Sequence, residues 1–117
     1  MAFSRRQLRS IIYNLLNNSL KYKSAVRRPA ILIQTARENE DIVIIISDNG
    51  IGIEKNKHEA VFTKYFRLDN ALEGSGIGLY LVKELVKNAG GDIALQSKPD
   101  EGTVIRIILK NLKIASV

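Results

Sequence analysis

The sequence predicts an α/β (α+β) two-layer sandwich, in which helices pack on one face of a mixed, mostly antiparallel sheet. Two segments repeat apolar side chains with the period of a helix. Four segments alternate or run apolar like strands, and polar turns join them into two hairpins. Because helices and sheets that are apolar on one face are stable when those faces pack together, this pattern favours a two-layer fold.

The composition is that of one globular domain, which we place at residues 1–117. Hydrophobic residues make up 45% of the chain and charged residues 26%, and there is no cysteine. Disulfides are therefore excluded. The longest apolar run, residues 42–46, is too short to cross a membrane. We expect no direct membrane insertion of this chain and a cytoplasmic location.

The net charge of +6 is unevenly placed, because eight lysines and arginines precede the first acidic residue, Glu38. Nucleic acid is not expected as a partner, since neither interleaved aromatic residues nor a known reading motif accompanies the charge. A phosphate-bearing small ligand and a solvated face each explain it.

The first helix is predicted from residue 4 to about residue 22. Ser4 can cap it, Gln7 completes a capping box, and Phe3 can pack on Leu8 as a hydrophobic staple. A basic loop, residues 23–29, follows.

The first hairpin joins Ala30–Ala36 to the β-branched run Ile42–Ser47, which we interpret as a central strand covered on both faces. The second hairpin joins Asp92–Lys98 to Thr103–Leu109.

Between the hairpins we expect a glycine-bearing loop, a short helix over His58–Phe66, a mobile segment and a second helix over Gly76–Ala89. The mobile segment is Arg67–Ser75, and Asn111–Val117 is expected to be a loosely held tail.

The segment NLLNNSLKY, residues 14–22, places polar side chains along one edge of the first helix. Asn14, Asn18 and Lys21 fall within an arc of about 60°, because a helix turns by roughly 100° per residue. One interpretation is a solvated helix edge. The other is a magnesium–phosphate site, since Mg²⁺ accepts amide oxygens and leaves its other positions to phosphates and water.

The segment DNGIGI, residues 48–53, follows the central strand. A carboxylate there is partly desolvated and needs hydrogen-bond donors, such as an adenine 6-amino group. Gly50 and Gly52 would let the backbone approach a flat base. The alternative is an Asn-Gly turn with a solvated Asp48.

The segment GSGIGL, residues 74–79, opens the second helix without an acidic residue in its first turn. A glycine-lined helix start of this kind is a good anion site. The alternative is a flexible hinge capped by Ser75. Neither a dinucleotide-binding fingerprint nor a Walker loop is present, because the required glycine and Gly-Lys-Ser/Thr are missing.

The order of these motifs resembles the ATP-binding domain of sensor histidine kinases, a branch of the Bergerat ATPases that also include gyrase, MutL and heat-shock chaperones. NLLNNSLKY is similar to the N box of that family, DNGIGI to its G1 box, VFTKYFR to its F box and GSGIGLYLVKEL to its G2 box. The resemblance runs from about Leu8 to Leu109.

The resemblance implies that ATP and Mg²⁺ are the cofactors. It implies that Asn18 ligates the metal, that Asn14 supports the metal or the phosphates, and that Lys21 contacts phosphate. Asp48 would bind the adenine amino group, and Arg67 or Lys64 could reach the γ-phosphate. The other implied nucleotide contacts are Tyr22, Gly50, Gly52, Ile53, Phe62, Gly74, Gly76, Gly78, Leu79 and Thr103.

Three departures stand out: Ser4 replaces the usual acidic residue, little of the preceding strand is present, and the lid is short. The near absence of that strand suggests a fragment of a longer protein. His58 lies between the G1 and F boxes, whereas the family's phosphoacceptor lies upstream in another domain, so we interpret His58 as an ordinary lid-region residue.

The function implied is that of a kinase catalytic domain, which donates the γ-phosphate to a histidine on a separate dimerisation domain. The implied partners are that domain, in a homodimeric parent of a class that can be anchored to a membrane, and a response-regulator receiver domain. Two alternatives stay open: an ATP-hydrolysing gyrase- or MutL-like ATPase, and a nucleotide-binding module without catalysis.

Overall fold

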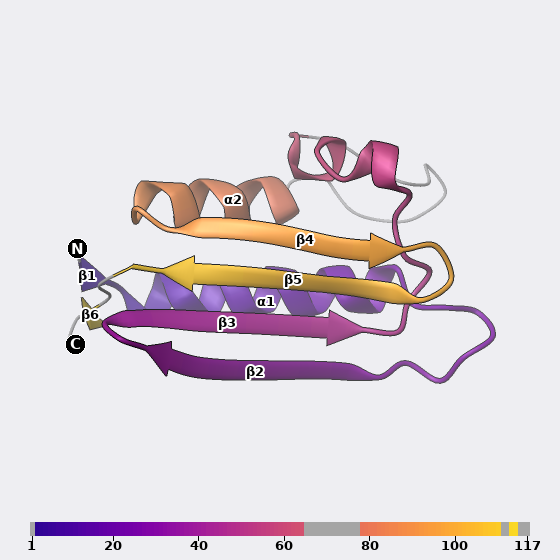
Figure 1. Cartoon of the computed structure of the whole chain (residues 1–117), viewed down its shortest axis with the longest axis horizontal. Coiled ribbons are helices and arrows are strands. Elements are labelled where there is room, and N and C mark those ends of the chain that lie inside the picture. The colour runs from indigo at the N-terminus through magenta and orange to yellow at the C-terminus, as the bar shows by residue number, and fades with distance from the viewer. Residues whose placement is uncertain (1, 65–77, 111–112, 115–117) are drawn as a thin grey trace.

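The computed structural model describes residues 2–64, 78–110 and 113–114. Its main sheet has four antiparallel strands in the order β2-β3-β5-β4. Figure 1 shows the four strands of this sheet side by side, with the long helices α1 and α2 behind the sheet. The strands are β2 (Ile31–Glu38), β3 (Asp41–Asp48), β4 (Asp92–Lys98) and β5 (Gly102–Leu109), and the helices are α1 (Arg5–Lys21) and α2 (Gly78–Asn88).

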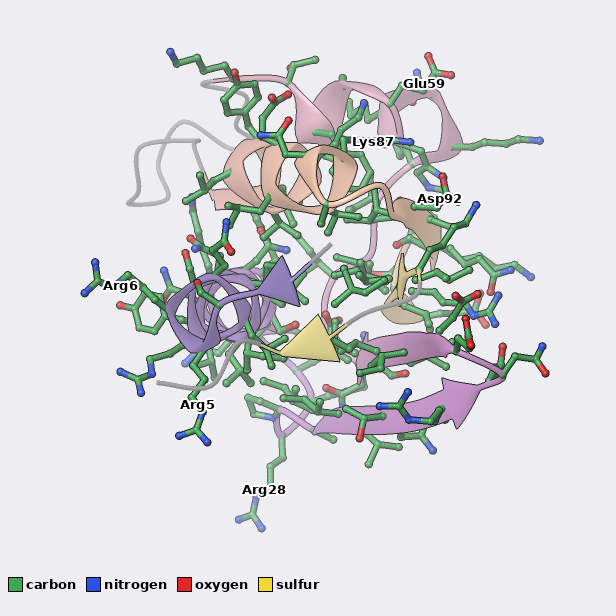
Figure 2. All side chains as sticks on the ribbon, turned by 90° about the vertical axis from the view of Figure 1, so that its left-hand side faces the viewer. Arg5, Arg6, Arg28, Glu59, Lys87 and Asp92 are labelled. Atoms are coloured by element: carbon green, nitrogen blue, oxygen red, sulfur yellow. The ribbon has the colours of Figure 1, made fainter. Side chains whose placement is uncertain are left out.

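Both helices lie on the same face of the sheet, which confirms the predicted two-layer sandwich (Figure 2). The sheet differs from the prediction in one respect, because its four strands are all antiparallel. Parallel pairing occurs instead in a separate two-stranded sheet, in which β1 (Ala2–Phe3) pairs with β6 (Lys113–Ile114). Part of the segment that we expected to be a loose tail is thus paired backbone.

Local capping explains where α1 begins and where α2 ends. The Gln7 amide donates to the Ser4 hydroxyl at 3.0 Å, and the Ser4 amide donates to the Gln7 side chain at 3.1 Å, so the capping box is confirmed. At the end of α2, the Gly91 and Gly90 amides donate to the Val86 and Lys87 carbonyls at 2.9 and 3.0 Å. This pair of bonds is a Schellman motif.

The core lies between the helices and the sheet. Its side chains from α1 and α2 pack against the inward-facing residues of β3 and β5, which alternate along each strand. The fully buried members are Ile11, Leu15, Ile44, Ile107, Leu109, Val82 and Val86. This packing holds the C-terminal ends of α1 and β3 at the same end of the domain.

The β3 strand is central, as predicted, but helices cover only one of its faces. Val43 alternates with the inward-facing Ile44 and so faces outward, yet it is only 2% exposed. Arg106 on β5 pairs with Glu38 on β2 at 3.5 Å, and β3 lies between those two strands. The apolar stem of Arg106 therefore crosses β3 and covers part of its outer face. The expectation that β3 is covered by further elements on both faces is therefore wrong. Helices cover its inner face, and a long side chain covers part of its outer face.

Over the described part of the helix predicted at residues 58–66, residues 58–64, the structure has a short 3₁₀ turn, and a second such turn precedes it. They are η1 (Lys55–Lys57) and η2 (Ala60–Phe62), and Thr63 ends the second with an extended backbone. Only Val61 of these turns is buried, so the segment lacks the apolar face that would stabilise a longer helix. The predicted mobile segment, residues 67–75, lies outside the described residues.

Within the part of the chain that the structure describes, no helix has the length and apolar character needed to span a membrane.

Candidate functional site

The end of β3 places Asp48 beside α1 and β5. The Asp48 carboxylate is half-buried and accepts hydrogen bonds from both neighbours. Its Oδ2 accepts from the Ser19 hydroxyl at 2.9 Å, and its Oδ1 accepts from the Thr103 amide at 3.3 Å. The Gly50 amide also donates to Oδ1, at 2.9 Å. These three donors hold the carboxylate in one orientation, and Oδ2 keeps a lone pair for a further donor.

The loop after β3, residues 49–53, is braced on the side of α1. The Ile51 amide donates to the Tyr22 carbonyl at 3.0 Å, and the Asn49 amide donates to the Ala30 carbonyl at 3.3 Å. Arg27 donates to the carbonyls of Asn49 and Gly50. Tyr22, a predicted nucleotide contact, therefore meets this loop through its backbone.

The same loop is braced on the side of the β4–β5 hairpin. The Ser97 hydroxyl accepts from the Ile53 amide and donates to the Gly102 carbonyl, both at 2.8 Å. Thr103 Oγ1 lies 2.8 Å from the Ser97 hydroxyl. Because the single Ser97 proton goes to Gly102, Thr103 is the donor in that last bond.

His58 closes the loop at its far end. Its Nε2 lies 2.9 Å from the Ile53 carbonyl, and a carbonyl can only accept, so Nε2 carries the proton. This contact supports the interpretation of His58 as a structural residue of the lid region.

Close contacts with the backbone of neighbouring segments leave no room for a side chain at either glycine of this loop. A Cβ on Gly50 would overlap the Tyr22 carbonyl oxygen, and a Cβ on Gly52 would overlap the Lys98 carbonyl oxygen. The loop is thus wedged between the end of α1 and the β4–β5 hairpin. These contacts with the protein's own backbone require glycine here independently of the predicted approach to a flat base.

Alanine substitutions can separate the close fit of Gly52 from backbone strain. Gly52 and Gly90 have nearly the same backbone angle, with φ of 74° and 77°, but a Cβ on Gly90 would meet no atom within 4 Å. Gly90→Ala is expected to lower the free energy of unfolding by about 1–2 kcal/mol through strain alone. Gly52→Ala is expected to lower it by a further 1–3 kcal/mol or so, because the backbone must also move.

Chemical denaturation of the two variants measures this difference. Equal losses would show that the contact between Gly52 and the hairpin contributes nothing.

The polar edge of α1 faces the start of α2. The Asn14 Nδ2 group donates to the Ser10 carbonyl at 2.7 Å, so the Asn14 amide oxygen takes no part in this hydrogen bond. A Cβ on Gly78 would lie 3.2 Å from that oxygen, so the first residue of α2 lies directly against Asn14. Asn18 is half-buried on the same edge, and the Lys21 ammonium lies 5.3 Å from the centroid of the Tyr22 ring. The structure therefore brings together the edge of α1 and Gly78.

The remaining predicted contacts are divided between the core and the segment that is not described. Ile53 and Leu79 are buried core residues, and Phe62 is half-buried with the Lys83 ammonium 5.8 Å from its ring centroid. The Lys64 ammonium lies 5.8 Å from the ring centroid of Tyr80. Arg67, Gly74 and Gly76 lie outside the described residues.

An open hollow of about 710 Å³ adjoins Asp48 and Thr103. It lies between the segment that carries Lys55 and His58 and the β4–β5 hairpin. Its size is within the range of small-molecule sites. A ligand there would meet the orientated carboxylate at one end.

The donor set fits magnesium held mainly by its phosphate ligand. Residues 2–64, 78–110 and 113–114 contain no group of three His, Cys, Asp or Glu side chains that could hold a metal. Asn14 instead offers a neutral amide oxygen beside Gly78 at the start of α2, and Asn18 carries a second amide on the same edge of α1. Mg²⁺ commonly takes only one or two protein oxygens and completes its shell with phosphates and water.

Four residues that the sequence analysis left without a role prove to be structural parts of this site. They are Ser19, Arg27, Asn49 and Ser97. A buried serine in the middle of an apolar helix face was the one available signal, because it requires a polar partner. The other three residues gave no such signal, because each forms a hydrogen bond with a residue far away in the sequence.

Comparison with known proteins shows the family to which the chain belongs. Residues 4–113 match the family described as histidine kinase-, DNA gyrase B- and HSP90-like ATPases. The chain is 37% identical over 116 residues to the histidine protein kinase SaeS of Staphylococcus aureus, which covers 96% of this chain and 33% of SaeS. It is 34% identical over 105 residues to the methanogenesis regulatory histidine kinase FilI of Methanothrix harundinacea, over 90% of this chain and 12% of FilI.

Solved structures give the same result. The mycobacterial sensor histidine kinase MprB superposes with a TM-score of 0.77 at 26% identity, over 90% of this chain and 70% of that one. Full-length ShkA, solved in complex with AMPPNP, shares the fold with a TM-score of 0.78 at 20% identity, over 95% of this chain and 22% of that one. This chain spans a third or less of the two curated relatives. The match over nearly its whole length shows that it belongs to the family of histidine kinase-, DNA gyrase B- and HSP90-like ATPases.

Proposed function

We propose that this chain is the ATP-binding catalytic domain of a two-component sensor histidine kinase, located in the cytoplasm. It binds Mg·ATP and presents the γ-phosphate to a histidine on a separate dimerisation domain, and a response-regulator receiver domain acts downstream. The relatives named histidine kinases, of which this chain spans only a part, support the class of protein.

The observation that carries the proposal is the orientated carboxylate of Asp48. Three hydrogen-bond donors of the protein hold it at the C-terminal end of β3, and an adenine amino group would be the fourth donor. Guanine presents a carbonyl at the same ring position, so the carboxylate would face an acceptor instead. The site therefore favours adenine over guanine.

The phosphate end of the site is the polar edge of α1 that carries Asn14, Asn18 and Lys21, and Asn14 on this edge lies against Gly78 at the start of α2. Asn18 would ligate magnesium, Asn14 would support the metal or phosphates, and Lys21 would contact phosphate. Bound magnesium would offset phosphate charge. The α2 start, which has no acidic residue among its described first-turn positions, adds a favourable dipole.

Asn14 favours the kinase over an ATP-hydrolysing enzyme. The resemblance to gyrase-type ATPases implies a glutamate in those enzymes where this chain has Asn14, with the role of activating water. An amide cannot act as a general base. The Asn14 amide nitrogen is also occupied by the Ser10 carbonyl, so the side chain is held by its own helix.

We expect the isolated chain to bind Mg·ATP in the micromolar range and to release phosphate only near the background rate. Binding needs the residues described above, whereas transfer also needs the acceptor histidine in line with the γ-phosphate. Calorimetric titration and phosphate release on the same sample measure both. Steady release at about 1 s⁻¹ or faster, as in an ordinary enzyme, would favour the ATPase.

Addition of the parent's dimerisation domain distinguishes a kinase from a pure binding module. The kinase labels the histidine of that domain, whereas the binding module does not. A stable label on His58 would contradict its structural role.

A further inference from the structure

We propose that Arg27 is a positioning residue that orients the Asp48 carboxylate through the peptide groups that follow it. The proposal rests on the proposed function, since it assigns the adenine amino group to Asp48. Arg27 lies in the loop between α1 and β2, at 21 residues before Asp48 in the chain.

The Arg27 guanidinium binds two consecutive carbonyls. Its Nε donates to the Asn49 carbonyl at 3.1 Å, and one terminal nitrogen donates to the Gly50 carbonyl at 2.9 Å. The side chain is half-buried. A planar guanidinium offers donors in a fixed fork, which a lysine ammonium does not match.

The first of these bonds leads directly to Asp48. The Asn49 carbonyl and the Gly50 N–H belong to the same peptide group, which is planar. Arg27 holds the oxygen of that group, and its N–H donates to Asp48 Oδ1 at 2.9 Å. The orientation of one plane therefore links the guanidinium to the carboxylate.

The second bond fixes the next peptide group in the same way. Arg27 holds the Gly50 carbonyl, and the N–H of that group, from Ile51, donates to the Tyr22 carbonyl at 3.0 Å. Both planes are thus held at their two ends. A cation at the carbonyl also polarises the peptide, which strengthens the bond that its N–H donates.

Loss of Arg27 should not detach the loop from its neighbours. The Asn49 side chain donates to the Arg28 carbonyl and accepts from the Ala30 amide, each at 2.9 Å. The Asp48 bonds from Ser19 and Thr103 do not involve Arg27. We therefore expect Arg27 variants to fold and to lose the orientation of the first peptide plane.

Arg28 provides a matched control. It is exposed, and Figure 2 shows its side chain pointing away from the domain. Substitution of either arginine by methionine removes the same charge from adjacent positions. Only Arg27→Met removes the fork on the two carbonyls.

The experiment compares ATP with purine riboside triphosphate, which lacks the 6-amino group. Arg27→Met is expected to weaken ATP binding about five- to tenfold and purine riboside triphosphate binding less than about twofold, because only ATP uses Asp48. Arg28→Met should change neither affinity by more than about twofold. Arg27→Lys should resemble Arg27→Met, since charge without the fork is not sufficient.

Amide hydrogen exchange at Gly50 gives a second readout, which should be faster in Arg27→Met and unchanged in Arg28→Met. An equal loss of affinity for both nucleotides, or an unchanged preference for ATP, would overturn the role of Arg27. A wild-type chain that binds both nucleotides equally would instead overturn the adenine assignment of Asp48, and this inference with it.

Discussion

Asp48→Asn is expected to weaken ATP binding by at least about tenfold, because an unpaired buried polar group costs about 1–3 kcal/mol. The carboxylate has two acceptor oxygens, and the protein already directs three donors at them. An amide has a single acceptor oxygen and two protons of its own. Whichever way the amide turns, its NH₂ group faces either the Gly50 and Thr103 amides or the Ser19 hydroxyl and the adenine amino group.

The control for this experiment is Asp100→Asn, which removes the same charge from an exposed turn near the site. Asp100 contacts the loop through its backbone amide, which donates to the Ile51 carbonyl at 2.8 Å and remains in the variant. Its φ of 65° also suits asparagine. Calorimetric titration should show the loss for Asp48→Asn alone. A wild-type chain with equal affinity for ATP and GTP would contradict the assignment of Asp48.

The elements that the sequence predicted well are those set by neighbouring residues. The capping box of α1 involves residues only three positions apart, and the glycines that end α2 bond within the last turns. The two hairpins follow from strand periodicity and short polar turns. The order of the recognised motifs also agrees with the family match over residues 4–113.

The parts that the sequence did not reveal depend on contacts between distant segments. Ser19 reaches Asp48 across 29 positions, and the Ile53 amide reaches Ser97 across 44. No local pattern specifies such pairs, because they depend on how α1 and the second hairpin pack on the sheet. The same is true of Arg106, which pairs with Glu38 on the far side of β3, so that its apolar stem covers part of the outer face of that strand.

The basic loop shows why composition alone did not reveal the role of Arg27. Its positive charge has two equally simple explanations, a solvated face and a phosphate ligand. The structure shows a third, since Arg27 binds backbone carbonyls of the loop after β3. Arg28, the adjacent residue with the same charge, points outward (Figure 2).

Asn18→Ala is expected to remove most of the magnesium dependence of ATP binding, a change of about tenfold or more. Even residues that only support a metal ligand are worth about 10–100-fold in metal affinity. Asn18 is half-buried on the edge of α1 that carries Asn14, and no described residue forms a hydrogen bond with its side chain. Its amide oxygen is therefore available to a ligand that the protein itself does not supply.

Asn17→Ala is the matched control, because Asn17 is the adjacent asparagine of the same helix and is exposed. ATP affinity is measured with magnesium and with a chelator, and the ratio of the two values is compared among the three proteins. The wild-type chain and Asn17→Ala should show the same ratio, while Asn18→Ala should approach a ratio of one. If Asn18→Ala keeps the full ratio, the metal is ligated elsewhere, and Asn14, whose oxygen lies against Gly78, becomes the residue to test.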